Sequence, residues 1–231
     1  MRKTRFFTQL DKSHLILLVV PIVLMLWVYY GKQAAFDELF GQVGGSWGQD
    51  ACSAIYEYST AFLLMFVVPA FIVKVVFKSG LRDFGLQLGD ARWGFRFVAI
   101  ALPVLLLAAY VGSLDPAVRE EYPLAKSMIG DVPTFLVVEV FYLFYYLGWE
   151  FLFRGFMLFG LEKYGALAAI LVQTIPSTIV HIGKPASESF AAIVAGLVFG
   201  YLAVRTRSIL YPLILHAAVG IGTDVFVALR L

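Results

Sequence analysis

Seven long apolar segments limit what this chain can fold into. A helix needs about 20 apolar residues to cross the hydrocarbon core of a bilayer. The segments are residues 14–30, 53–77, 94–112, 133–161, 165–182, 188–205 and 208–229. The chain is 61% hydrophobic and only 15% charged, whereas soluble domains carry about 25% charged residues. The sequence therefore predicts an all-α, polytopic membrane protein with about seven transmembrane helices.

The basic residues predict how these helices are oriented. Cytoplasmic connections of membrane proteins carry an excess of lysine and arginine. Here the excess precedes the first segment and returns in every second connection, with Arg2, Lys3, Arg5, Lys12, Lys74, Lys78, Arg82, Arg92, Arg96, Lys163, Arg205 and Arg207. We therefore expect a cytoplasmic N-terminus, a C-terminus on the other side, and a multi-pass protein of a prokaryotic plasma membrane.

Composition also narrows the organisation and the partners. The single cysteine, Cys52, excludes an internal disulfide and a multi-cysteine metal cluster. A net charge of +2 gives no indication of nucleic-acid binding. The first apolar segment lacks a small-residue cleavage site, so we interpret it as a retained span. We expect one membrane domain over residues 1–231, with a motif-bearing core at about 133–225, surrounded by the lipid bilayer.

Ionisable side chains inside the apolar segments are the candidate functional residues. Each costs about 2.5–3.5 kcal/mol near the centre of a transmembrane helix, so such residues usually have a function. The late segments contain Glu139, Glu150, Arg154, His181, His216 and Asp224. Glu57 lies near the start of the second segment, where an interfacial position is also compatible with its charge.

The fourth segment places several of these residues on one helical face. Glu139, Tyr142, Tyr146, Glu150 and Arg154 follow the helical period. Glu150 and Arg154 are four residues apart and can form an ion pair. One interpretation of this pair is purely structural, as a neutralised contact that fixes helix packing.

The two histidines favour a chemical interpretation. A carboxylate held by an arginine can stay ionised and take a proton from water, with Glu150 as the base and Arg154 orienting it. His181 can share that water or protonate a leaving amine, and His216 can donate to a developing oxyanion. Together these groups meet the needs of peptide-bond hydrolysis.

Three short motifs resemble those of a known family. They are "WEFLFRG" at 149–155, "STIVHIGKP" at 177–185 and "HAAVG" at 216–220. They are similar to the Glu-Glu-x-x-x-Arg, aromatic-x-x-x-His and His-x-x-x-Asn/Asp motifs of the CPBP (Abi) family of CAAX prenyl proteases and bacteriocin-processing enzymes. The resemblance implies an intramembrane glutamate endopeptidase that acts on a membrane-embedded or lipid-linked peptide, without a metal or other cofactor.

The chain departs from the family pattern at three positions. Trp149 replaces the first glutamate, Ser177 the aromatic residue and Gly220 the asparagine. The family's first glutamate is thought to activate water, so Glu150 would take over that role after a small helix rotation. Other groups could provide support. Asp224 or Thr223 would replace the polar group missing at Gly220, Glu188 would reach His181, and Glu139 shares the polar face of the fourth segment.

Two other functions remain open on the sequence. A proton-coupled permease could use the same groups as a relay, although the chain shows no inverted repeat. A non-catalytic membrane protein could bind a substrate tail without cleaving it. A zinc site is disfavoured because no His-Glu-x-x-His helix is present. Gly196 and Gly200 form a small-xxx-small pattern that predicts close helix packing.

Overall fold

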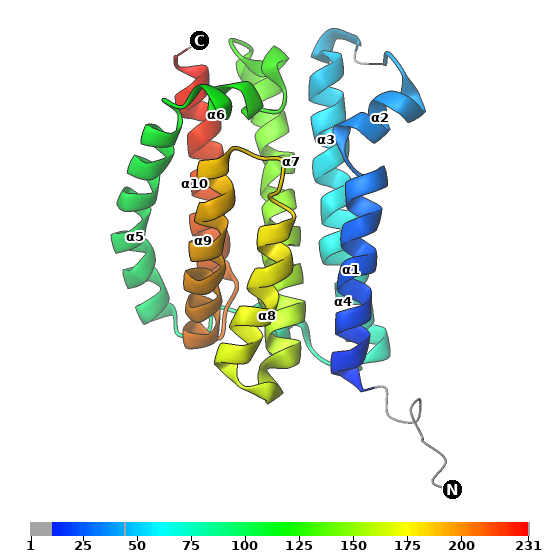
Figure 1. The fold of residues 1–231 in the computed structure, drawn as a ribbon, viewed down its shortest axis with the longest axis vertical. Helices are drawn as coiled ribbons and strands as arrows, with labels where there is room; N and C mark the ends of the chain where they lie inside the picture. Colours follow the sequence, from blue (N-terminus) through cyan, green and yellow to red (C-terminus); the bar gives the residue numbers. More distant parts are fainter. Residues whose placement is uncertain (1–10, 44, 231) are drawn as a thin grey trace, which may run out of the picture.

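The computed structural model describes residues 11–43 and 45–230, and its helices run up and down one long axis (Figure 1). Four helices of membrane-spanning length are α-helical throughout. They are α1 (Lys12–Tyr30), α5 (Ala91–Gly112), α9 (Ala186–Thr206) and α10 (Leu210–Ala228). Two longer helices contain π-helical turns. One joins α3 (Gln49–Phe62), η2 (Leu63–Val67), α4 (Val68–Phe71) and η3 (Ile72–Val76), and the other joins α7 (Val132–Glu150) and η6 (Phe151–Phe159).

Shorter elements connect these helices. They are α2 (Gln33–Phe40), η1 (Gly45–Trp47), η4 (Leu81–Phe84), α6 (Pro116–Glu121), η5 (Lys126–Met128), η7 (Glu162–Tyr164) and α8 (Ala166–Ile179). The predicted all-α, polytopic membrane architecture is confirmed. Within the described residues, six helices are long and apolar enough to cross a membrane.

The predicted count of seven spans is corrected at the fifth segment, 165–182. Its helix, α8, has 14 residues, about 21 Å at 1.5 Å per residue, whereas the hydrocarbon core is about 30 Å thick. The chain cannot continue the helix because Gly183 has a φ of +102° and Pro185 has no N–H group. The connection from α8 to α9 therefore lies part-way along the bundle, beside α7 (Figure 1).

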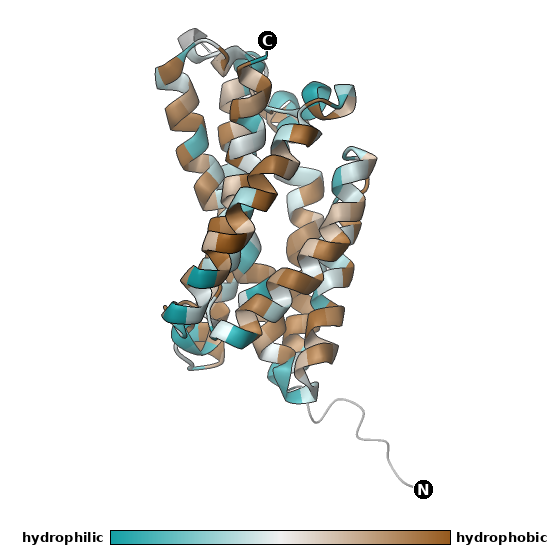
Figure 2. Cartoon of the chain, turned by 90° about the vertical axis from the view of Figure 1, so that its left-hand side faces the viewer, coloured by the Kyte–Doolittle hydropathy of each residue, from teal (hydrophilic) through white to brown (hydrophobic). Residues whose placement is uncertain are grey.

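The surface of the bundle matches a bilayer environment. Hydrophobic residues dominate its middle, while hydrophilic residues gather toward both ends (Figure 2). Large apolar side chains face outward on several helices, among them Leu18, Ile100, Leu136 and Leu167. Helix α1 begins and helix α10 ends at opposite ends of the bundle (Figure 1). The termini lie where the seven-segment prediction puts them, because α8 and the connection after it carry the chain back along the bundle before α9.

Small residues bring α8 and α9 together, as the glycine pattern predicts. A Cβ atom at Gly196 would lie 2.6 Å from Cγ2 of Thr174, and one at Gly200 would lie 3.1 Å from Cγ2 of Ile170. The buried amide of Gln173 donates to the carbonyl of Gly196 at 2.9 Å. The packing interpretation of these glycines is therefore confirmed, and α9 is held against the helix that leads to His181.

Candidate active site

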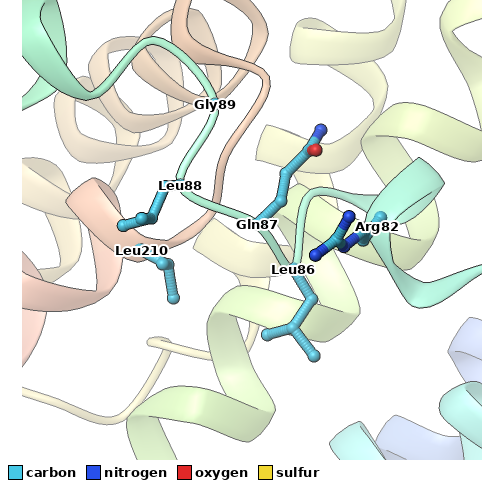
Figure 3. A pocket seen from close by; sticks show the side chains of 6 residues that line it. All are labelled: Arg82, Leu86, Gln87, Leu88, Gly89 and Leu210. Carbon is cyan, nitrogen blue, oxygen red and sulfur yellow. The ribbon is translucent and has the colours of Figure 1, made fainter.

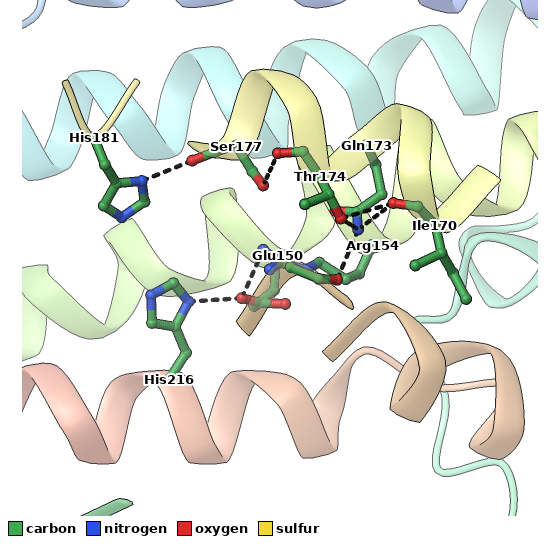
Figure 4. Close-up of polar contacts among 9 residues, drawn as sticks. Glu150, Arg154, Ile170, Gln173, Thr174, Ser177, His181 and His216 are labelled. Carbon is green, nitrogen blue, oxygen red and sulfur yellow. Dashed lines mark hydrogen bonds and ion pairs between the residues drawn. The ribbon is translucent and has the colours of Figure 1, made fainter. Parts of the chain in front are cut away.

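The carboxylate of Glu150 joins two of the predicted site residues. Its Oε1 atom accepts from Arg154 Nη1 at 3.2 Å and lies 2.7 Å from His216 Nδ1. Figure 4 shows this carboxylate between the Arg154 side chain and the ring of His216. Glu150 is 0% exposed and Arg154 is 2% exposed. The predicted ion pair therefore forms, and α10 brings His216 onto the same oxygen.

Glu150 and Arg154 depend on each other because both side chains are buried. The guanidinium of Arg154 also lies 5.7 Å from the ring of Phe199 on α9. A buried charge is tolerated when it is paired, and removing one partner leaves the other uncompensated. The Glu150–Arg154 pair also lies in an irregular stretch of helix, because the π-helical segment η6 begins at Phe151, directly after Glu150. Such π turns occur frequently at functional sites.

Hydrogen bonds define which nitrogen of each imidazole faces the site. Nδ1 of His181 lies 2.7 Å from the carbonyl oxygen of Ser177, and a carbonyl can only accept. Nδ1 of His216 lies against the Glu150 carboxylate, which also accepts when ionised. In neutral rings both Nδ1 atoms therefore carry the proton, and each Nε2 atom presents a lone pair.

Trp149 lies between the two histidines. Its ring centroid is 5.2 Å from that of His181 and 6.2 Å from that of His216, and both contacts are edge-on. The side chain is buried among aromatic rings that include Trp27 and Phe153. An indole therefore occupies the position at which the resemblance leads one to expect a carboxylate.

The histidines and Trp149 border a small internal cavity of about 40 Å³. The cavity is lined by Trp27, Glu57, Tyr58, Tyr122, Leu124, Tyr142, Tyr145, Tyr146, Trp149, Val180, His181, Lys184, Glu188 and His216. Its volume suits one water molecule, which occupies about 30 Å³ in the liquid. Glu150 does not border the cavity, so its carboxylate reaches the space through His216 and not directly.

Two other carboxylates do line the cavity. Tyr122 donates from its hydroxyl to Oε1 of Glu188 at 2.7 Å. Burial, followed by the nearby Glu188 carboxylate, raises the pKa of the Tyr122 phenol well above its usual value and so keeps this donor protonated. Glu57 accepts from the backbone N–H of Gln33 at 3.1 Å. Glu188 thus shares a cavity with His181, the residue that sequence reasoning expected it to reach.

Sequence reasoning missed the contribution of the first half of the chain. Glu57 is buried and borders the cavity, although its position in the sequence is equally compatible with an interfacial residue. Tyr122 lies in a connection that carries no motif. The sequence did contain a signal for the cavity itself, in the tyrosines of α7. Tyr142 and Tyr146 share the helical face of Glu150, and both line the cavity.

Three candidate supporting residues lie elsewhere. Glu139 and Asp224 are both buried and their carboxyl groups are close to each other between α7 and α10, but none of the four oxygens has a hydrogen-bond partner among the described residues. Thr223 donates to the carbonyl of Val219 on its own helix at 2.9 Å. None of the three borders the cavity, so none is in a position to replace the polar group missing at Gly220.

A second cavity, of about 470 Å³, lies at the end of the bundle where α1 begins. Arg82, Leu86, Gln87, Leu88, Gly89 and Leu210 line it (Figure 3). No candidate site residue borders this cavity. Over residues 11–43 and 45–230, no group of three or more histidine, cysteine or acidic side chains is arranged to hold a metal ion.

Comparison with known proteins agrees with this geometry. Residues 131–221 match a family model described as "Type II CAAX prenyl endopeptidase Rce1-like". The matched segment runs from the start of α7 into α10 and contains Glu150, His181 and His216. Searches of curated proteins and of solved structures gave no match. The resemblance in the three motifs is confirmed, because residues 131–221, which contain them, are similar to the Rce1-like type II CAAX prenyl endopeptidases.

Proposed function

We propose that this protein is an intramembrane endopeptidase that hydrolyses a peptide bond in a membrane-embedded or lipid-linked substrate. One observation carries the proposal. The rings of His181 and His216 border one water-sized cavity inside the helix bundle, and both Nδ1 atoms are occupied by acceptors. Two basic Nε2 atoms therefore remain available to a water molecule.

The water is activated by His216 in this mechanism. Its oxygen forms a bond to the scissile carbonyl carbon while one of its protons passes to Nε2 of His216. Glu150 lies 2.7 Å from the other ring nitrogen and stabilises the imidazolium that forms, as a buried carboxylate does in other hydrolytic sites. Glu150 is thus a positioning residue, and Arg154 holds it in place. This assignment differs from the sequence-based expectation, in which Glu150 itself was the base.

His181 and Glu188 orient the water from the other side of the cavity. Nε2 of His181 accepts the second O–H of the water, and Glu188, held by Tyr122, provides a further acceptor. Collapse of the tetrahedral intermediate breaks the C–N bond. The proton then moves from Nε2 of His216 to the leaving nitrogen, so the products are a carboxylic acid and an amine.

The family match and the lining of the cavity support a lipid-linked substrate. Half of the lining side chains are tyrosine or tryptophan, and such surfaces accept apolar ligands with few polar contacts. The cavity of about 40 Å³ is too small for a peptide, so substrate entry requires the aromatic side chains to move apart.

Hydrolysis of a farnesylated, internally quenched fluorescent peptide with a CAAX-type C-terminus tests the proposal. The protein is assayed in liposomes, with Glu150→Gln and His181→Ala as variants. We expect kcat to fall at least 100-fold in each, because Glu150→Gln removes the charge that stabilises the His216 imidazolium and His181→Ala removes an acceptor that orients the water. Glu38→Gln is the matched control, because Glu38 is exposed on α2, and it should retain full activity.

The alternatives give different results in the same system. Unchanged hydrolysis in both Glu150→Gln and His181→Ala would refute the endopeptidase mechanism. Proton or solute flux through the liposomes that depends on Glu150 would instead support a permease. Binding of the farnesylated peptide without cleavage by the wild-type protein would support a non-catalytic binding protein.

A further inference from the structure

Position 220 has no room for a side chain. Gly220 lies one helical turn after His216 on α10, in the position where the third motif has a polar residue. A Cβ atom added there would lie 1.6 Å from Oη of Tyr146 and 2.5 Å from its Cζ. No real Cβ atom approaches another heavy atom so closely. The tip of the Tyr146 phenol therefore fills the space that a side chain at position 220 would need.

Tyr146 reaches this space from α7. It lies one turn before Glu150 and therefore on the same helical face. Its ring centroid is 4.7 Å from that of His216, and the side chain lines the cavity that holds both histidines. A hydroxyl from one helix thus takes the place of a polar side chain on another, next to the same imidazole.

Four other hydrogen-bond donors of this cavity are already committed, and the indole N–H of Trp27 is a further donor, without a partner among the described residues. The Nδ1–H groups of the histidines bond to Ser177 and Glu150. The hydroxyl of Tyr122 donates to Glu188, and the ammonium of Lys184 pairs with Glu121. The ring of Tyr142 packs against that of Tyr146, with the two centroids 4.5 Å apart. A phenol hydroxyl can turn its proton about the C–O bond, so the O–H of Tyr146 can point into the cavity that its side chain borders.

We propose that Tyr146 is a catalytic residue that donates a hydrogen bond to the scissile carbonyl oxygen as it becomes an oxyanion. The proposal rests on the endopeptidase function proposed above. The hydroxyl proton stays on the phenol throughout, so Tyr146 neither gains nor loses a proton in the cycle. A fixed donor in a water-poor site stabilises the charge that develops in the transition state more than it stabilises the substrate.

The test compares Tyr146→Phe with Tyr201→Phe. Tyr201 is exposed on α9 and borders neither cavity, and each variant removes one hydroxyl without changing the ring. With the farnesylated quenched peptide, we expect Tyr146→Phe to lower kcat by about 10²- to 10³-fold, as loss of one oxyanion donor does. KM should stay within about twofold, because the donor acts in the transition state. Tyr201→Phe should keep wild-type kinetics.

A second readout separates chemistry from substrate binding. A phosphinate analogue of the farnesylated peptide carries a tetrahedral, negatively charged group at the scissile position. Its Kd should rise in Tyr146→Phe by a factor similar to the loss of kcat, because both report binding of the oxyanion. The melting temperature of Tyr146→Phe in detergent should match that of the wild type, which shows that the fold is intact.

Restoration of the missing side chain provides a third readout. Gly220→Asn in the wild-type background should inactivate the protein, because the new side chain collides with Tyr146. In a Tyr146→Ala background the same substitution has room, and we expect hydrolysis at least tenfold above that of Tyr146→Ala alone. Equal inactivity of Tyr146→Ala and Tyr146→Ala/Gly220→Asn would argue against an oxyanion role at this position.

The two proposals fail in distinguishable ways. If Tyr146→Phe keeps kcat within about threefold of the wild type while His181→Ala is inactive, the oxyanion role is overturned and the endopeptidase function stands. If neither variant lowers hydrolysis, or if the wild-type protein does not hydrolyse the peptide, both proposals are overturned.

Discussion

Glu150 holds a charge inside the bundle because two partners from two helices meet at one of its oxygens. Arg154 comes from the next turn of the same helix, and His216 comes from α10. The second oxygen, Oε2, has no hydrogen-bond partner among the described residues. The carboxylate is therefore held through one oxygen only. His216 borders the cavity and Glu150 does not, so it is the histidine that faces this space.

Glu188 gives a prediction at the same scale. Its carboxylate borders the cavity and is held by the Tyr122 hydroxyl at 2.7 Å. We expect Glu188→Gln to lower kcat for the farnesylated peptide at least tenfold, because an amide is a weaker acceptor for the water. Tyr122→Phe should have a smaller effect, since the carboxylate remains but is less well fixed.

Glu120→Gln is the control for Glu188→Gln. Glu120 is exposed on α6 and should be replaceable without loss of activity. Wild-type kcat in Glu188→Gln would show that Glu188 has no part in orienting the water, and would leave the two histidines as its acceptors.

At the scale of elements, the early end of α8 is what brings His181 to the cavity. The backbone leaves the helix after Ile179, and His181 lies in the turn that precedes Gly183 and Pro185. A helix that continued across the bilayer would carry the following residues to the far surface. Ser177 contacts Nδ1 of His181 through its backbone carbonyl oxygen. Every residue has this carbonyl, so Nδ1 keeps its partner although the aromatic side chain of the motif is missing at this position.

The sequence could predict part of this arrangement and not the rest. The fourth and seventh segments show their charged residues clearly, and the contact of Glu150 with Arg154 follows from their spacing. The end of α8 could not be predicted, because the apolar residues continue past it. A short apolar helix and a complete transmembrane span then have the same hydrophobic pattern. The π-helical turns of η6 leave no mark on the hydrophobic pattern. The positions of Glu57 and Tyr122 depend on packing between distant segments.

Packing of α9 on α8 gives the prediction for this scale. We expect Gly196→Val to destabilise the protein, because a Cβ atom at this position would already lie 2.6 Å from Thr174. Overpacking of this kind costs about 1–3 kcal/mol. Gly112→Ala is the control, since a Cβ atom at Gly112 meets no other atom within 4 Å. Thermal unfolding in detergent measures both variants, and equal stability of Gly196→Val and wild type would contradict close packing here.

At the scale of the whole molecule, the two ends of the bundle differ in charge. Basic residues gather where α1 begins, and they include Lys12, Lys74, Lys78, Arg82, Arg92, Lys163, Arg205 and Arg207. Several are neutralised in place, as in the ion pairs of Arg205 with Asp90 at 3.0 Å and of Arg207 with Glu162 at 2.5 Å. The opposite end carries Asp37, Asp115, Glu120, Glu121 and Asp131. This asymmetry supports a cytoplasmic position for the basic end.

Labelling of single cysteines tests that orientation. In a Cys52→Ala background, Leu88→Cys places a thiol at the basic end and Leu114→Cys places one at the acidic end. These two leucines are 59% and 49% exposed, so both thiols are accessible to reagent. In intact bacterial cells a membrane-impermeant maleimide should label Leu114→Cys at once and Leu88→Cys only after lysis. Labelling of Leu88→Cys from outside would reverse the topology, and would put the guanidinium groups of Arg205 and Arg207 on the side that lysine and arginine normally avoid.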